Sequence, residues 1–146
     1  MVESSLCSMS LRSLVNCCKE QLAIMFGCER VNMILVDRIR KDFYTYSHDS
    51  ELGIQRTKSF AIEQSLAAHS AISCHSIYTE KVEDESRFIR EIDDPQSYRN
   101  DNLPKARQII TCPIFSLCDF KNSSNISNLP RAVIQLINKD SNKDFD

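Results

Sequence analysis

The sequence predicts an α+β fold, with a central antiparallel sheet of about five to six strands and helices on both faces. Two observations carry this prediction. Residues 4–26 repeat apolar side chains at three- and four-residue steps, which is the period of an amphipathic helix. Residues 107–117 and 131–139 are runs rich in Ile, Val and Thr on either side of a Ser- and Asn-rich stretch, and they indicate a closing pair of strands.

The other elements are predicted from residue type and period. β-branched and aromatic runs predict further strands at 31–37, 42–48, 57–62 and 77–80. Small and apolar residues on one helical face predict a helix at 63–74. The acidic segment that follows should contain a helical turn that stops before Pro95, because the residue before a proline disfavours helical backbone angles. Residues 96–106 are expected to form an irregular polar loop.

Composition and charge exclude several classes of function. The 146 residues suffice for one domain, and a net charge of −2 gives no attraction to nucleic acid or to an anionic membrane. No run approaches the roughly 18 consecutive apolar residues of a membrane-spanning helix. The first ten residues are acidic where a secretory signal would be basic. We therefore expect a cytoplasmic domain with no nucleic-acid partner and no membrane insertion.

The residues that commonly carry chemistry form no catalytic or metal-binding pattern. The seven cysteines include no C-x-x-C pair, and we expect them to be buried or half-buried free thiols. His69 is expected to cap a helix or pack in the core rather than bind a metal. Glu91, Asp93 and Asp94 could act as acid–base carboxylates, but no nucleophile lies near them in the sequence. The sequence predicts no catalytic and no metal-binding residue in this chain.

Four stretches resemble a known family in their order and spacing. They are "ERVNMILVD", "EQSLAAHSAISC", "DESRFIREIDD", and "ARQIITCPIF" followed by "AVIQLINK". Together, over residues 10–146, they resemble a GAF domain, and most closely the regulatory GAF domains of cyclic nucleotide phosphodiesterases. The resemblance implies a single GAF domain over 1–146, with an N-terminal helix at 4–26 and the sheet core and pocket over 31–139.

The C-terminal residues match the start of a family motif. Asn138, Lys139 and Phe145 correspond to the Asn, Lys and Phe that lead into the last helix of these domains. Residues 140–146 would only begin that helix, so the resemblance implies that the C-terminal helix is missing from this chain. The acidic partner of the family's lysine would then be absent as well.

The resemblance further implies a cyclic nucleotide pocket on one face of the sheet. Backbone N–H groups at the helix start, Leu66 and Ala67, would hold the cyclic phosphate, because a helix N-terminus favours anions. Asn32 and Asp93 would face the base. The other ligand-facing positions would be Tyr46, Ser47, Asn100 and Gln135.

Two departures from the family pattern concern this pocket. The family's two glycines at the helix start are Ser65 and Ala68 here, and their side chains obstruct a close approach of phosphate to the backbone. The segment 93–108 is also several residues longer than in the family and contains Pro104. The ligand-facing positions of this segment are therefore the least securely aligned.

Two functions remain open at this point. The first is a regulatory sensor that binds cGMP or cAMP and controls an attached catalytic domain, such as a cyclic nucleotide phosphodiesterase. The alternative is a ligand-free structural GAF domain that serves dimerisation or assembly. In either case we expect a homodimer through the N-terminal helix, and no cofactor.

Overall fold

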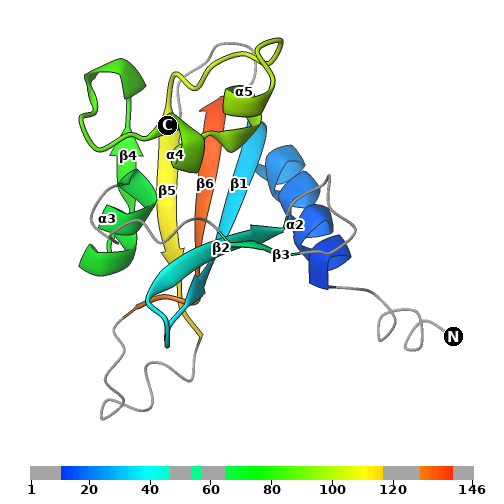
Figure 1. Ribbon diagram of the computed structural model, residues 1–146. Coiled ribbons are helices and arrows are strands. Elements are labelled where there is room, and N and C mark those ends of the chain that lie inside the picture. Colours follow the sequence, from blue (N-terminus) through cyan, green and yellow to red (C-terminus); the bar gives the residue numbers. More distant parts are fainter. Residues whose placement is uncertain (1–10, 47–53, 57–64, 117–128, 140–146) are drawn as a thin grey trace, which may run out of the picture.

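The computed structural model describes residues 11–46, 54–56, 65–116 and 129–139 of the chain. These residues contain a six-stranded sheet in the order β3-β2-β1-β6-β5-β4, and every neighbouring pair is antiparallel (Figure 1). The strands are β1 (Cys28–Asp37), β2 (Asp42–Tyr46), β3 (Ile54–Arg56), β4 (Ile77–Thr79), β5 (Ile109–Ile114) and β6 (Ala132–Lys139). The predicted α+β class and antiparallel sheet are confirmed.

The two central strands, β1 and β6, carry the longest pairing. Their register runs from Cys28 opposite Lys139 to Leu35 opposite Ala132. On its other edge β1 pairs with β2 only over its last three residues, beginning at Leu35 opposite Tyr44. Within the described part of the chain, the first half of β1 therefore has a strand neighbour on one side alone.

One face of the sheet is covered by α2 (Leu11–Phe26). Leu22 and Ala23 of this helix pack against Val31 and Leu136 of the sheet. The helix ends at Gly27, whose φ of 60° is in the left-handed region that glycine adopts without steric cost. The predicted end of this helix at residue 26 is confirmed, whereas residues 4–10 of the predicted helix lie outside the described residues.

The opposite face carries the remaining helices, which are α3 (Leu66–Ser73), the 3-10 turn η1 (Val82–Asp84), α4 (Arg90–Asp93) and α5 (Pro95–Arg99). Small residues of α3, Ala67 and Ala71, pack against Ile34 and Val133 of the central strands. Figure 1 shows α5 at one end of β1 and β6, beyond α4. Helices thus cover both faces of the sheet, as predicted.

Several predicted boundaries are wrong for identifiable reasons. The first strand begins at Cys28 because its pairing with β6 extends to Lys139. Pro95 stops α4 but also begins α5, since a proline at the first helical position has no N–H to leave unsatisfied. Residues 96–99 are therefore helical rather than loop. A short strand lies at Ile54–Arg56, and the predicted strand 57–62 falls outside the described residues.

Three further predictions concern exposure and the chain end. His69 is exposed on α3, so the expectation of a capping or core histidine was wrong. Cys28 is buried and Cys17 is exposed, so the cysteines do not share one environment. The predicted start of a C-terminal helix at 140–146 lies outside the described residues. No helix among those that are described has the length and apolar character needed to cross a membrane.

Candidate functional site

Five of the predicted ligand-facing residues lie together on the α3 side of the sheet. Asn32 comes from β1, Gln135 from β6, Leu66 and Ala67 from the start of α3, and Asp93 from the end of α4. Asn32 and Gln135 face each other directly in the β1–β6 register. All five are buried, and Leu66, Ala67, Asp93 and Gln135 have no exposed surface. The chain therefore brings together residues that lie far apart in the sequence.

The carboxylate of Asp93 is the centre of this group. Its Oδ2 accepts hydrogen bonds from the backbone N–H groups of Leu66 at 3.1 Å and Ile89 at 2.9 Å. Its Oδ1 accepts from the N–H of Ala67 at 3.0 Å and from Nε2 of Gln135 at 2.9 Å. Four donors thus converge on one negative charge.

Every backbone N–H group in the first turn of α3 already donates a hydrogen bond to a protein acceptor. A helix leaves its first N–H groups without intrahelical partners, and these are the groups that a phosphate would bind. Here the N–H groups of Leu66 and Ala67 are bound by Asp93, and that of Ala68 is bound by Oγ of Ser65 at 3.0 Å. The next N–H, of His69, donates to the Ser65 carbonyl at 2.9 Å. Asp93 therefore occupies the position that the family resemblance assigns to a cyclic phosphate.

The two amide side chains extend this network across the sheet. Asn32 Nδ2 donates to Gln135 Oε1 at 2.7 Å and to the Ile92 carbonyl at 3.0 Å. Gln135 Nε2 also donates to Thr111 Oγ1 at 3.3 Å. Because buried polar groups need partners, these bonds hold α4 against the central strands. In this conformation the amides bind protein groups rather than a purine.

Burial raises the pKa of Asp93 above its usual range, since the site excludes the water that would solvate the charge. The hydrogen bonds from the Ile89 N–H, the Gln135 amide and the α3 backbone oppose this shift. The positive end of α3 favours the ionised carboxylate as well. These hydrogen bonds therefore reduce the free-energy cost of burying the charged carboxylate at this position.

Asp94, the next residue, makes a second buried network that sequence reasoning missed. Its Oδ1 and Oδ2 each lie 3.0 Å from Nη2 of Arg30, and Oδ1 also accepts from Nε of Arg30 at 3.3 Å. Asp94 also accepts from Ser97 Oγ and, at 3.1 Å, from the Ala106 N–H. The two adjacent aspartates thus pin the α4–α5 segment to α3 and to β1. Arg30 lies in the "ERVNMILVD" stretch, but nothing in that stretch indicates Asp94 as its partner.

Of the three remaining predicted ligand-facing residues, the structure places Asn100 outside this group. Asn100 is exposed, and its Oδ1 accepts from the Asn102 N–H at 3.0 Å in a local turn. Tyr46 ends β2, where its backbone pairs with Ile54. Ser47 lies outside the described residues.

The predicted motif residues have structural contacts. Asn138, with a left-handed φ of 57°, accepts from the Arg107 and Gln108 N–H groups and donates to Glu29 Oε2 at 2.9 Å. Lys139 Nζ donates to the Phe26 carbonyl at 3.0 Å, which places a positive charge at the C-terminus of α2. Both residues therefore hold β6 to its neighbours. Phe145 lies outside the described residues.

A separate cavity of about 840 Å³ is lined by residues between Glu80 and Phe88 and by residues 105–108. This volume is within the range of about 300–1,000 Å³ that is common for ligand sites. Its lining mixes three acidic side chains with three basic ones, Lys81, Lys105 and Arg107. No predicted ligand-facing residue lines it, and its charges balance rather than favour a phosphate.

Comparison with known proteins agrees with the architecture. No protein-family model and no curated protein matches this sequence. Among solved structures, the chain is similar to the GAF domain of a two-component sensor histidine kinase from Bacillus halodurans, at 17% sequence identity and a TM-score of 0.53. The match covers 92% of this chain and 80% of that chain. The chain therefore has the GAF fold, as its sequence motifs implied.

Proposed function

We propose that this chain is a regulatory GAF domain of a signalling protein and that it acts through self-association of α2. In this proposal Asp93 closes the site where the family resemblance places a cyclic nucleotide. The observation that carries the closed site is the complete occupation of the first-turn donors of α3 by Asp93 and Ser65. An anionic ligand has no free backbone N–H to bind there. The kinase from which the similar GAF domain comes supports a place in signalling.

The outer side of α2 supports self-association. Leu14, Ile24 and Met25 are 47%, 75% and 72% exposed, and Cys17 between them is exposed too. With Gln21, these residues recur at three- and four-residue steps, the spacing by which one helix packs along another. Pairing of two copies along this stripe would remove this apolar surface from water.

Association is tested by sedimentation velocity over a range of chain concentrations. We expect concentration-dependent dimerisation of the wild type and a monomer for the double variant Ile24→Glu with Met25→Glu, because two buried charges would face each other. The matched control is Ile39→Glu, which changes an isoleucine that is 93% exposed on the β1–β2 turn. A wild type that stays monomeric, or a control that dissociates as fully as the double variant, contradicts the proposal.

The second candidate function is a cyclic nucleotide sensor for cGMP or cAMP that controls an attached catalytic domain, such as a cyclic nucleotide phosphodiesterase. One observation favours it: the backbone N–H groups of Leu66, Ala67 and Ile89 converge on a single anionic position beside the amide of Gln135. A cyclic phosphate could take this position if the Asp93 carboxylate moved out. The family resemblance supports the same ligand class.

Calorimetric titration with cGMP and then cAMP separates the two candidates. The closed site predicts no saturable heat for the wild type and a gain of binding in Asp93→Ala, where the donors are released. A sensor predicts saturable binding by the wild type, in which the displaced Asp93 carboxylate faces the base, so Asp93→Ala weakens binding by about 1–3 kcal/mol, the cost of an unpaired polar group. Asp84→Ala, at an exposed acid of η1, is the control. The wild-type titration decides by itself if Asp93→Ala does not fold.

A further inference from the structure

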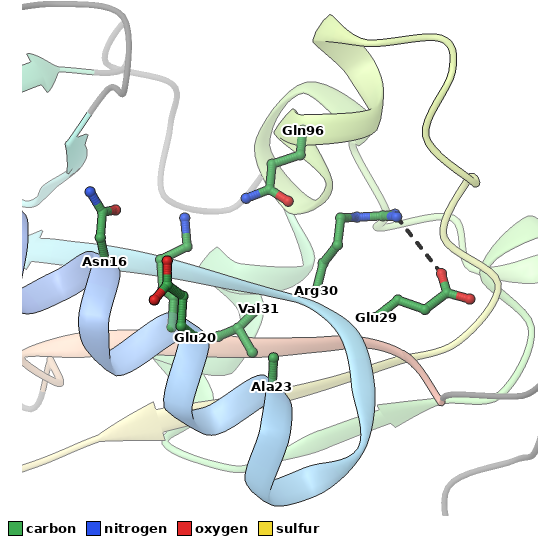
Figure 2. Close-up of a pocket in the computed structure, with 8 residues that line it drawn as sticks. Asn16, Glu20, Ala23, Glu29, Arg30, Val31 and Gln96 are labelled. Atoms are coloured by element: carbon green, nitrogen blue, oxygen red, sulfur yellow. Dashed lines mark ion pairs between the residues drawn. The ribbon is translucent and has the colours of Figure 1, made fainter.

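A smaller cavity lies at the edge of β1 where no described strand pairs with its first half, away from the Asp93 group. Its volume is about 220 Å³, and α2, the start of β1 and α5 line it. Figure 2 shows Gln96 reaching from α5 toward α2, with Asn16 and Glu20 on the facing helix and Ala23 and Val31 between them. This site is separate from the Asp93 group and from the exposed apolar stripe of α2.

Two of the charged residues that line this cavity are neutralised by protein partners. Arg30 is bound by both carboxylate oxygens of Asp94. Glu29 lies 3.8 Å from Arg30 and 3.5 Å from Arg107, and it accepts from Asn138. The charges of these two residues are therefore already compensated and do not attract a ligand ion.

The other polar side chains of the lining lack such partners among the described residues. They are Asn16, Lys19, Glu20 and Gln96. Within the described part of the chain, none of the four makes a side-chain hydrogen bond or ion pair. Lys19 and Glu20 are neighbours on α2, and successive helix residues point about 100° apart, so the two charges do not pair with each other. One positive charge, one negative charge and two amides thus remain available in one cavity.

Lys19 is the most informative of these side chains. Burial lowers the pKa of its ammonium group, because loss of solvation disfavours the charged form. A partly buried cation without a partner is costly to the folded state. A bound carboxylate would supply the missing negative charge.

The backbone of β1 adds a further donor and acceptor. The Val36 N–H donates to Arg131 on the β6 side, and in an antiparallel pair alternate residues point to alternate edges. The backbone groups of Val31 therefore point to the outer edge, where β2 does not reach. Val31 is also part of the cavity lining.

We propose that this cavity binds a small zwitterion of the size of a free amino acid, with the ligand carboxylate on Lys19 and Gln96 and its ammonium group on Glu20. The cavity has the volume of about seven water molecules, at roughly 30 Å³ each. It is smaller than the roughly 300 Å³ at which sites for drug-sized ligands begin. Such a ligand would bridge α2 to α5 and would stabilise the packing of α2 by mass action.

The test is an NMR titration of the full chain with the standard amino acids, first pooled and then singly. We expect saturable shifts of the Asn16 and Gln96 side-chain amide signals with at least one amino acid. Its deaminated acid and its decarboxylated amine serve as matched probes, for example propionate and ethylamine beside alanine. Each should bind about tenfold more weakly or worse, since each lacks one charged hydrogen-bonding group.

Variants locate the site. Lys19→Met and Glu20→Gln should each weaken binding by about tenfold or more, whereas Lys81→Met, on the other cavity, should leave it unchanged. Glu20 is exposed, so Glu20→Gln preserves the fold if Lys19→Met does not. The proposal is overturned if no amino acid shifts these amides, if the matched acid binds as tightly as the amino acid, or if Glu20→Gln binds like the wild type.

Discussion

The two polar regions beside β1 differ in how their charges are satisfied. On the α3 side, Asp93 is buried, and every one of its partners is a protein group. Along the edge of β1 that no described strand pairs with, Lys19 and Glu20 line a cavity, and neither makes a side-chain hydrogen bond or ion pair with another described residue. The region where the family resemblance placed a ligand is closed, and a region where it placed none is open.

The difference teaches that residue type alone does not define a binding site. The same backbone N–H groups that could hold a phosphate hold a carboxylate of the chain itself, because α4 delivers Asp93 to the start of α3. These hydrogen bonds hold α4 against the start of α3, and in this conformation they leave the Leu66 and Ala67 N–H groups without a free position for a ligand.

The largest effect is expected from Arg30→Ala, which removes the partner of Asp94. Breaking a buried ion pair from one side costs about 3–5 kcal/mol, because the other charge stays buried without compensation. Urea unfolding measures the change in the free energy of unfolding. Arg87→Ala is the control, since its pair with Glu85 at 2.7 Å lies near the surface, with side chains 37% and 17% exposed, and should contribute at most about 1 kcal/mol. Equal losses in both variants would mean that Asp94 is solvated.

Asp93→Ala should cost roughly 3 kcal/mol. It leaves the N–H groups of Leu66, Ala67 and Ile89 unpaired, at about 1–3 kcal/mol for each fully buried donor, and removal of a buried charge offsets part of this loss. Thermal and urea unfolding both report the change. A variant as stable as the wild type would show that water reaches the start of α3 and replaces the carboxylate.

Asp93 should also make stability depend on pH. Its folded pKa is raised above the unfolded value of about 3.9, so the folded chain binds more protons in the window above that value. The contribution of Asp93 to stability is therefore fully present below the unfolded pKa and is lost as pH rises through the folded pKa. The slope is at most about 1.4 kcal/mol per pH unit. It should vanish in Asp93→Asn, and a slope of the opposite sign would mean that the hydrogen bonds outweigh burial.

The smallest effect is expected from Ser65→Ala, which removes the side-chain cap of α3. Oγ of Ser65 accepts from the Ala68 N–H at 3.0 Å, and loss of such a cap costs about 1 kcal/mol. Ser86→Ala, at an exposed serine outside any helix, is the control. If the two substitutions have equal effects on unfolding, Asp93 alone satisfies the first turn.

The sequence motifs were sufficient to predict the fold and the convergence of Asn32, Asp93 and Gln135. The β1–β6 pairing brings Asn32 opposite Gln135, and no local pattern predicted this pairing, because it joins the first and last core strands of the chain. That these side chains satisfy one another was not predictable, since it depends on distances between segments 42 and 103 residues apart.

The features that were missed have similar causes. The Arg30–Asp94 pair joins residues 64 positions apart, so no local pattern predicts it. Pro95 was interpreted as a stop, although proline is equally suited to the first position of a helix. The cavity at the edge of β1 depends on where α2 and α5 pack, and no residue pattern in either helix indicates it.

The most direct test of the closed site is amide hydrogen exchange, followed by NMR in the wild-type chain without ligand. The account predicts that the Leu66, Ala67 and Ile89 amides are protected as strongly as those of β6, and that Asp93→Asn accelerates their exchange specifically. Rapid exchange of these three amides in a chain whose β6 amides remain protected would contradict it. Their hydrogen bonds would then open locally, and the donors would be available to a ligand.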